Sequence, residues 1–422
     1  MRARIFPSSP MGTLKAIASK SVAHRLLICA AFAKGETRVR CEELNEDICA
    51  TVRCLNALGA RIDRDDKDFL VHPVTTPTVG ATLDCGESGS TLRFLLPVAC
   101  ALGADAAFLM AGRLPVRPQS PLREELERGG VTLSPQGSNP LLCKGTLRET
   151  HFSIAGGVSS QFLRGLLFAL AVLGKAGSIT VEGQLESAPY VELTADALAL
   201  FGVNVIKTEN GFAILENHGL RSPGQVLTEG DWSNAAFPLC MGAVGKKPIT
   251  VEGLNLASRQ GDRAIVELLS RFGASIHREA DRVTVTPAPL RGIDIDASQI
   301  PDLVPVLATV AAVSEGKTVI RGASRLRLKE SDRLQTVHAL LETLGGQVTE
   351  TPDGLIVDGV TTLRGGQVSS FGDHRIAMSA AVASLACTDP VTVEEAQVTA
   401  KSYPSFWEDM RQIGLQFDTD CQ

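Results

Sequence analysis

Lysines and arginines recur beside short polar segments that each precede an apolar run of helical length. These cations are Lys20, Arg25, Arg93, Arg117, Lys329, Arg333, Arg375 and Lys401. Helix N-termini bind phosphates and carboxylates through free N–H groups and the positive end of the helix dipole. Arginine also matches the geometry of both anions. The pattern therefore predicts a site for small, strongly anionic ligands, although any single cation could equally be a surface residue beside a helix cap.

Three acids lie among these cations, and they could supply proton transfer. They are Asp302 in IPDLVP, Glu330 in KESDR and Asp373 in GDHR. A carboxylate held ionised by a neighbouring cation can accept a proton, and a second one in a different environment can donate one. Asp302 and Asp373 could instead act only as helix N-caps, and His374 could cap a helix or contact a ligand. The chain contains neither a nucleophile elbow nor metal-ligand spacing, so a serine-hydrolase triad and a metal centre are not indicated.

The polar segments that carry these residues begin at regular intervals. Their markers, 69, 70, 73, 69 and 72 positions apart, are Ser21, Ser90, Ser160, Ser233, Asp302 and His374. In one copy, Ser159, Ser160 and Gln161 precede an apolar run from Phe162 to Leu173. A serine at the start favours a helix N-cap, and a run that is apolar on nearly every face predicts a buried helix.

A second marker repeats out of phase with the first. It is a glycine that ends a helix before an alternating strand, a turn and another strand. The copies, 71, 72, 71, 72 and 69 positions apart, are Gly59, Gly130, Gly202, Gly273, Gly345 and Gly414. Glycine readily takes the left-handed conformation that ends helices. Two independent markers with one period predict a sixfold internal repeat, which divides the chain into two α/β domains of three units each.

The ends of the chain suggest how the two domains are connected. ARIF near the N-terminus reads as a strand, and the sixth repeat reaches Phe417 without its closing strand. The N-terminal strand could complete that repeat, which would make repeats one to three an insertion. The expected domains are 17–229 for repeats one to three, and 1–16 with 230–422 for repeats four to six. Two adjacent crossings of this kind predict a hinge that closes around a ligand.

Composition narrows the class of protein further. The net charge is −6, which disfavours a protein that coats nucleic acid, and ten cysteines occur without CxxC pairs. Reduced thiols in a cytoplasmic protein are the simplest interpretation. No signal peptide opens the sequence, and no apolar run reaches membrane-spanning length, so no membrane association is expected.

Nine short stretches resemble one enzyme family, 5-enolpyruvylshikimate-3-phosphate (EPSP) synthase, and run in its order over the whole chain. They are SKSVAHR, GESGSTLR, RLPVRP, SSQF, ESAPY, IPD, LKESDR, GDHR and AKSYP. LKESDR and DHRIAM together are specific. The resemblance implies a two-domain inside-out α/β barrel, in which each domain holds three βαβαββ repeats and a double crossover joins the two domains.

The resemblance also implies the reaction, that of a 3-phosphoshikimate 1-carboxyvinyltransferase in aromatic amino-acid biosynthesis by the shikimate pathway. The 5-hydroxyl of shikimate 3-phosphate attacks C2 of phosphoenolpyruvate while C3 is protonated, and the tetrahedral intermediate then loses phosphate. No metal or organic cofactor is expected. Asp302 resembles the base that takes the hydroxyl proton and Glu330 the acid that serves C3, with Lys20 sharing proton transfer. Closure would exclude water and strengthen the electrostatics on the charged intermediate.

The substrate contacts are implied in the same way, motif by motif. The positions that resemble shikimate 3-phosphate contacts are Lys20, Ser21, Arg25, Ser159, Ser160, Gln161, Ser187, Tyr190, Asp302 and Lys329. Those that resemble phosphoenolpyruvate contacts are Lys20, Gly89, Arg93, Arg117, Gln161, Arg333, Arg375 and Lys401. Glu87 and Arg325 depart from the family's common pattern, which has asparagine at both places. An acid beside an anionic substrate is unexpected, so Glu87 should point away or pair with an arginine.

Three other functions are compatible with parts of the pattern. An enolpyruvyl transferase acting on UDP-N-acetylglucosamine shares the repeat, but it uses a Lys-Asn pair where this chain has Lys20-Ser21. It also has a cysteine on a loop that matches Arg113 to Pro121, where no cysteine occurs. A DNA sliding clamp would need basic rather than apolar helices, and an inactive scaffold would not need both acids. A monomer is the expected state.

Overall fold

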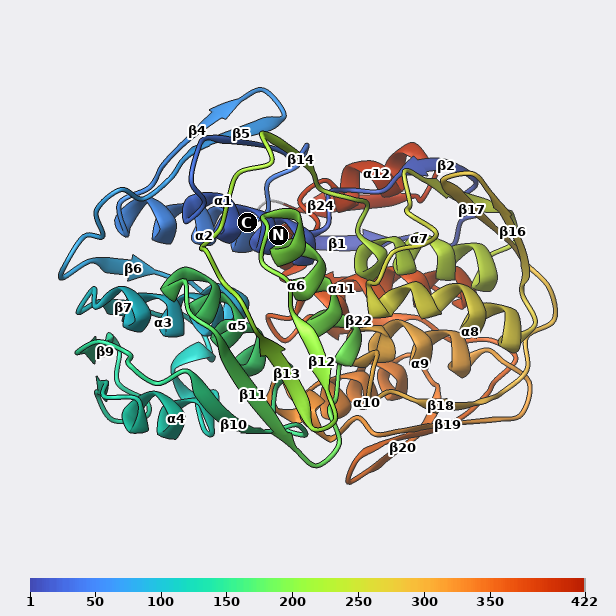
Figure 1. Cartoon of the computed structure of the whole chain (residues 1–422). Coiled ribbons are helices and arrows are strands. Elements are labelled where there is room, and N and C mark those ends of the chain that lie inside the picture. The colour runs from blue at the N-terminus through green and yellow to red at the C-terminus, as the bar shows by residue number, and fades with distance from the viewer. Residues whose placement is uncertain (421–422) are drawn as a thin grey trace. The chain divides into compact units, whose positions relative to one another are not determined.

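The computed structural model describes residues 1–420, which divide into two compact units (Figure 1). Unit 1 combines Met1–Ile17 with the segment from Glu229 onward, and unit 2 is Ala18–Thr228. Each unit has its own apolar core, which is centred on Trp232 and its neighbours in unit 1 and on Phe94, Phe162 and Phe168 in unit 2. No helix in residues 1–420 is long and apolar enough to span a membrane.

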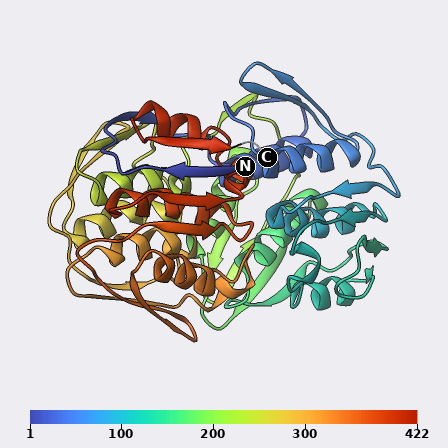
Figure 2. The same cartoon turned by 180° about the vertical axis from the view of Figure 1, so that it is seen from behind.

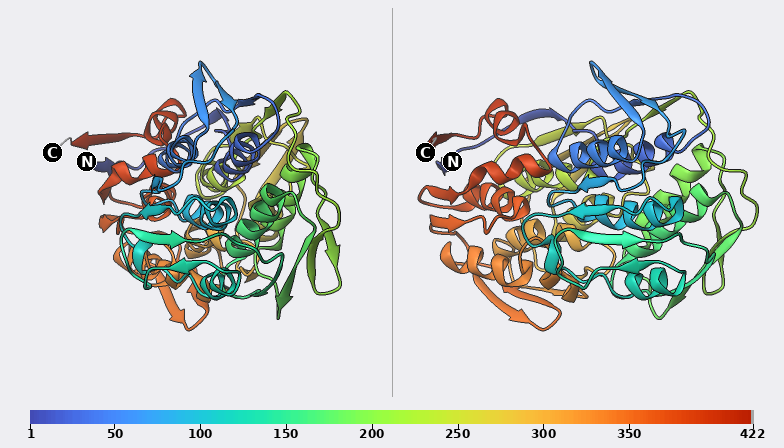
Figure 3. Two further views of the ribbon diagram at one scale, coloured as in Figure 1. Left: turned by 60° about the vertical axis from the view of Figure 1, so that its left-hand side comes forward. Right: turned by 90° about the vertical axis from the view of Figure 1, so that its left-hand side faces the viewer.

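The strands of unit 2 form three sheets, and most of its helices are buried. Its strands are β3 Thr37–Arg40, β4 Arg61–Asp65, β5 Asp68–His72, β6 Thr82–Asp84, β7 Ala107–Leu109, β8 Thr132–Leu133, β9 Leu141–Lys144, β10 His151–Ala155, β11 Gly177–Glu182, β12 Ile206–Thr208, β13 Gly211–Ile214 and β14 Gln225–Leu227. Its helices are α1 Lys20–Ala31, α2 Glu46–Ala57, α3 Gly89–Leu102, η1 Leu114–Val116, α4 Leu122–Arg128, α5 Ser160–Leu173 and α6 Ala188–Leu200. The β4–β5 hairpin projects from the body of this unit (Figure 3).

Unit 1 is built in the same way from three sheets. Its strands are β1 Arg2–Ile5, β2 Gly12–Lys15, β15 Ile249–Glu252, β16 Ser275–Glu279, β17 Arg282–Thr286, β18 Asp294–Asp296, β19 Lys317–Arg321, β20 Gln347–Thr351, β21 Gly354–Asp358, β22 Gly366–Ser369, β23 Val391–Glu394 and β24 Phe417–Asp420. Its helices are α7 Trp232–Val244, η2 Gly261–Ala264, α8 Ile265–Phe272, η3 Pro301–Leu303, α9 Val304–Ala312, η4 Ser324–Leu328, α10 Arg333–Thr343, α11 His374–Ala383, η5 Ser384–Ala386, η6 Ala396–Lys401 and α12 Phe406–Gln412.

The six sheets within residues 1–420 follow one plan, which confirms the predicted sixfold repeat. Each has four strands, for example β10-β11-β13-β12, in which β10 and β11 are parallel and the last two strands form an antiparallel hairpin. The six glycines that mark the repeat all have positive φ, as expected where a helix ends in a left-handed residue. The fold is therefore the predicted mixed α/β class.

Strands near the two chain crossings complete sheets that lie far away in sequence. β1 lies between β23 and β24 and pairs antiparallel with both, so it fills the place of the missing last strand of repeat six (Figure 2). β2 is the outer parallel strand beside β15, and β14 is the outer parallel strand beside β3. Each unit is thus closed by strands from both ends of its own segments.

Helices α3 and α5 pack at very short range because Gly165 of α5, which has no side chain, faces α3. A Cβ atom added to Gly165 would lie 2.2 Å from the carbonyl oxygen of Arg93 and 3.1 Å from Cγ of Pro97. Pro97 lies inside α3 and has no N–H, so it cannot donate the regular helical bond to that same carbonyl. The contact fixes Arg93 and the start of α5 relative to one another.

Candidate active site

The buried helices of unit 2 begin with neutral caps. The hydroxyls of Ser19, Ser88 and Ser159 accept backbone N–H bonds at the starts of α1, α3 and α5. A serine cap brings no negative charge to the helix dipole, unlike the Asp231, Asp332 and Asp373 caps of unit 1. The N-termini in unit 2 consequently retain their preference for an external anion.

Arg93 and Gln161 are coupled at the facing starts of α3 and α5. The Arg93 guanidinium donates to Oε1 of Gln161 at 2.6 Å, and Nε2 of Gln161 donates to the hydroxyl of Ser90 at 3.0 Å. A Cβ atom on Gly89 would lie 3.0 Å from Arg117 and 3.2 Å from Arg93. The fold thus brings together four predicted positions from three segments, and position 89 has no room for a side chain without moving a guanidinium.

Lys20 and Arg25 lie on α1 and contact different neighbours. Nζ of Lys20 forms an ion pair with Asp47 at 2.8 Å. Arg25 is buried and donates to the hydroxyl of Thr194 at 2.9 Å, to the carbonyl of Tyr190 at 2.9 Å and to the carbonyl of Ser21. Arg25 therefore joins α1 to α6, and burial lowers its pKa to about 10.

The other predicted serines of unit 2 lie at helix starts. Ser160 is buried at the first position of α5, and its hydroxyl and carbonyl accept bonds from Arg164. Ser187 precedes α6 with φ of 54°, a conformation unusual for a residue other than glycine. A strained backbone of this kind is characteristic of functional sites, where the surrounding structure holds it in place.

Glu87 lies against the loop that follows β7. A Cβ atom on Gly112 would meet Oε1 of Glu87 at 2.5 Å, so the carboxylate lies across this glycine. Gly112 has φ of 54°, and it provides both the turn and the space that the carboxylate occupies.

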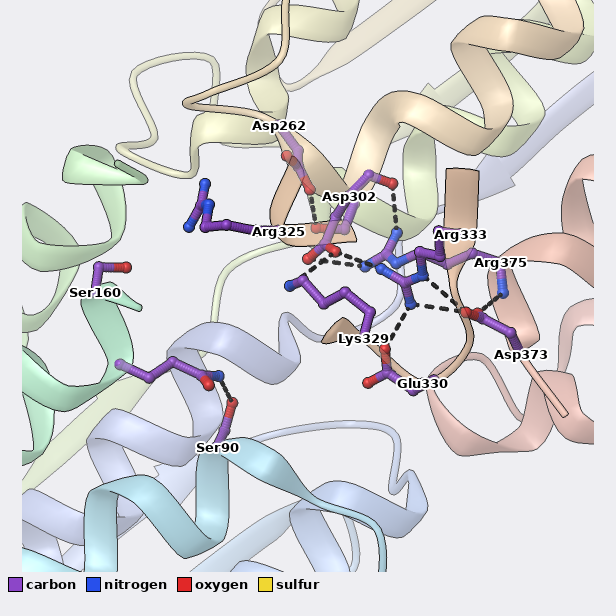
Figure 4. Close-up of polar contacts among 12 residues, drawn as sticks. Ser90, Ser160, Asp262, Asp302, Arg325, Lys329, Glu330, Arg333, Asp373 and Arg375 are labelled. Atoms are coloured by element: carbon purple, nitrogen blue, oxygen red, sulfur yellow. Dashed lines mark hydrogen bonds and ion pairs between the residues drawn. The ribbon is translucent and has the colours of Figure 1, made fainter. Parts of the chain in front are cut away.

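Asp302 is the centre of a charged cluster in unit 1 (Figure 4). Its carboxylate lies 2.7 Å from Arg333, 3.5 Å from Lys329 and 3.5 Å from Arg375. Arg375 also donates to the Asp302 carbonyl at 3.2 Å. Burial alone would raise the pKa of this carboxyl, but the three cations hold it well below the usual range. Asp302 is therefore ionised at neutral pH, and it makes no side-chain cap for a helix.

Arg333 connects Asp302 to the two other predicted acids. It donates to Glu330 at 2.9 Å and to the two oxygens of Asp373 at 2.8 and 3.2 Å. Asp373 is fully buried and caps α11, which confirms its predicted capping role and adds a second one. Burial opposes the charge of Arg333, but the carboxylates of Asp373, Glu330 and Asp302 outweigh this effect and raise the pKa of Arg333. The cluster therefore holds a permanent cation.

Four polar groups near these positions were not anticipated from the sequence, namely Asp47, His24, Asp262 and Arg164. Asp47 holds Lys20, and Arg164 braces Ser160. His24 heads a buried chain of hydrogen bonds through Thr51 and Thr91, each 2.7 Å long. Burial lowers the pKa of His24 to about 3, so its imidazole is neutral. Two sequence signals could have pointed to His24: it lies one helical turn after Lys20, and it belongs to the SKSVAHR stretch.

Lys401 and Arg325 are two further positions in unit 1. Lys401 is buried at the end of η6, and Arg325 donates to the carbonyl of Ser298 at 2.8 Å. The nine cysteines in the described part of the chain are free thiols, as expected. No group of three or more His, Cys, Asp or Glu residues within 1–420 could hold a metal ion.

Comparisons with known proteins identify relatives of this chain. A family model described as EPSP synthase (3-phosphoshikimate 1-carboxyvinyltransferase) matches residues 7–410. A 3-phosphoshikimate 1-carboxyvinyltransferase from Clostridium kluyveri is 41% identical over 98% of this chain and 97% of the relative. One from Clostridioides difficile is 37% identical over 98% of each. The structure of an EPSP synthase from Acinetobacter baumannii superposes with a TM-score of 0.83 at 25% identity, covering 99% of both chains.

Proposed function

This chain belongs to the EPSP synthase family, and we propose that it transfers the enolpyruvyl group of phosphoenolpyruvate to the 5-hydroxyl of shikimate 3-phosphate. The products are 5-enolpyruvylshikimate 3-phosphate and inorganic phosphate. The observation that carries the proposal is the Asp302 cluster, in which one ionised carboxylate faces three cations. Both substrates carry a phosphate and a carboxylate, and such cations would offset the repulsion between them.

In the proposed mechanism, Asp302 accepts the proton of the 5-hydroxyl as that oxygen bonds to C2 of phosphoenolpyruvate. Glu330, with Lys20 sharing the role, delivers a proton to C3. The tetrahedral intermediate then loses phosphate from C2 and the C3 proton, which restores the double bond. Alignment of the two substrates would itself supply a large part of the rate.

The charges around Asp302 suggest how substrate binding activates it. Arg333, Arg375 and Lys329 hold the pKa of the free carboxyl well below its usual range, which makes it a weak base before substrate binds. When substrate anions engage those same cations, part of the positive potential at Asp302 is neutralised. The pKa of Asp302 then rises toward a value suited to proton abstraction, because less positive charge remains nearby to stabilise the ionised carboxylate.

We propose the following contacts for each substrate. Shikimate 3-phosphate would contact Lys20, Ser21, Arg25, Ser159, Ser160, Gln161, Ser187, Tyr190, Asp302 and Lys329. Phosphoenolpyruvate would contact Lys20, Gly89, Arg93, Arg117, Gln161, Arg333, Arg375 and Lys401. We assign 17–229 to the shikimate 3-phosphate domain, and 1–16 with 230–422 to the second domain. We also propose that the hinge closes when ligand binds. The protein would be a monomer with a cytoplasmic location.

The decisive test is phosphate release from phosphoenolpyruvate with each of two acceptors. Release with shikimate 3-phosphate alone is expected, whereas release with UDP-N-acetylglucosamine alone would assign the chain to the related transferase. Asp302→Ala should bind both substrates and lose most turnover, and unchanged turnover would remove Asp302 from the mechanism. Arg25→Ala should weaken shikimate 3-phosphate far more than phosphoenolpyruvate. Small-angle scattering should show a smaller radius of gyration with shikimate 3-phosphate, and light scattering measures the oligomeric state.

A further inference from the structure

Asp262 is a second buried acid near the Asp302 cluster, and no step of the mechanism uses it. It lies in η2 and is fully buried. Its Oδ2 accepts a hydrogen bond from the hydroxyl of Ser233 at the start of α7. Its Oδ1 is buried and has no hydrogen-bond partner among the described residues. A buried carboxylate whose hydrogen bond comes from a hydroxyl and not from a cation is costly to keep ionised.

The backbone of η2 is fixed, so the position of Asp262 is not accidental. Gln260, just before η2, accepts a bond from the Trp232 amide at 3.1 Å and donates to the Gly230 carbonyl at 2.8 Å. It also donates to Glu229 at 2.9 Å. These bonds tie the loop to the first turn of α7, and they aim the Asp262 side chain toward Asp302 (Figure 4).

The charged groups that face Asp262 are Asp302 on η3, Arg375 on α11 and Asp231 at the cap of α7. Burial is the largest influence on the pKa of Asp262. Burial and the Asp302 charge together raise this pKa to about 6, against the opposing effects of Arg375 and of the Ser233 hydrogen bond. The effect is mutual, because two carboxylates that interact titrate as a pair. Negative charge on Asp262 therefore opposes the three cations that suppress the basicity of Asp302.

We propose that Asp262 is a positioning residue for the reaction, whose buried negative charge keeps Asp302 basic enough to take the proton of the acceptor hydroxyl. This inference rests on the proposed function, since it needs Asp302 to act as the base. It predicts that the enzyme is faster when Asp262 is ionised. A merely structural role for Asp262, such as holding the start of α7 through Ser233, would instead give a loss that does not change with pH.

The experiment compares wild type with Asp262→Asn, which keeps the shape and removes the charge. The ratio of their kcat/KM values is measured from pH 5 to pH 8.5, because both substrates' phosphate titrations cancel in this ratio. We expect the ratio of wild type to variant to be near one at the acid end and to rise roughly three- to tenfold in a single step near pH 6. A rise of this size corresponds to a change of about one unit in the pKa of the base, Asp302. A ratio that does not vary with pH would overturn the proposal.

Ser233→Ala is the matched variant, because it keeps the Asp262 charge but removes its hydrogen bond. That bond favours the ionised form, so its loss should move the step to higher pH without abolishing it. Circular dichroism and the fluorescence of buried Trp232 establish that each variant is folded. A step that stays in place in Ser233→Ala would show that it does not arise from Asp262.

An infrared titration separates this inference from the proposed function. The C=O stretch of protonated Asp262 is the band that disappears in Asp262→Asn, and it should titrate near pH 6 in wild type. In Asp302→Asn its midpoint should fall, because a like charge has been removed. An unmoved midpoint refutes the coupling whatever the activity. If wild type releases no phosphate with shikimate 3-phosphate, the proposed function fails while this titration still decides whether the two acids interact.

Discussion

Gly165→Ala tests whether the close packing of α3 against α5 is a structural requirement of unit 2. The new Cβ would lie 2.2 Å from the Arg93 carbonyl oxygen, whereas real Cβ contacts are not shorter than 3.0 Å. The helices would have to separate by at least about 0.8 Å, the difference between these two distances. Backbone atoms of a buried helix cannot rotate away as a side chain can, so the penalty should lie at the upper end of the ~1–3 kcal/mol range for overpacked cores.

The assay exploits the distribution of tryptophan between the units. Both tryptophans, Trp232 and Trp407, belong to unit 1, so their fluorescence reports on that unit, and far-UV circular dichroism reports on both. With a urea m-value of about 2–3 kcal/mol/M, a loss of ~2–3 kcal/mol lowers the dichroism midpoint by roughly 1 M. The KM for phosphoenolpyruvate should also rise, since Arg93 moves with its helix.

The control for this substitution is Gly157→Ala. A Cβ on Gly157 would meet nothing within 4 Å. Alanine there should leave the midpoint within about 0.5 kcal/mol of wild type, as for other surface changes. If Gly165→Ala unfolds at the wild-type midpoint, the contact at Arg93 is not a constraint and the packing argument is wrong.

Three further changes probe the charged and polar groups. Arg333→Met should lower the free energy of unfolding by about 3–5 kcal/mol, because it leaves the buried aspartate that caps α11 without its cation. Tryptophan fluorescence in denaturant measures this loss, and Arg327→Ala, at partly exposed ion pairs, should lose less than about 1 kcal/mol. Asp262→Asn should gain stability relative to wild type between pH 4 and pH 7, by up to about 3 kcal/mol. The reason is that folding raises the pKa of Asp262 from 3.8 to about 6 in wild type. The free energy of unfolding of wild type therefore falls as pH rises through this window, by ~1.36 kcal/mol for each unit of pKa shift. A difference independent of pH would contradict that linkage. Thr51→Val should lose about 1–3 kcal/mol by circular dichroism, because Nδ1 of the buried His24 loses its partner, and Thr51→Ser should restore most of it.

Local sequence signals predicted most of the fold. The six periodic glycines set the repeat, since each occupies a left-handed helix end that other residues rarely adopt. The apolar run after Ser159 predicted a buried helix, and α5 is buried over most of its length. The place of β1 was also predicted, because the sixth repeat lacked a strand that the N-terminal residues could supply.

The candidate site was predicted less completely. Motif positions such as Asp302 and Arg333 were identified from their neighbours in sequence, and they lie within ion-pair distance. Asp262 was missed because its importance depends on burial and on Asp302, which is forty positions away. His24 was missed for the same reason, since a histidine in an apolar helix gives no sign that Thr51 of another helix will face it. Pairings between segments depend on how the repeats pack, and a single sequence does not specify that packing.

The place of β1 between β23 and β24 has a consequence for how the chain is made. Its register partners are Val391–Val393 and Phe417–Asp420, roughly four hundred residues further along. During synthesis, β1 emerges long before β23 and β24, and it has no sheet to join until those two strands have been made. Ala18–Thr228 emerges in between and can fold while β1 waits. The nascent chain therefore carries β1 as an unpaired strand until residues 391–420 have been made, and for that time residues 2–5 are open to chaperones that bind extended segments.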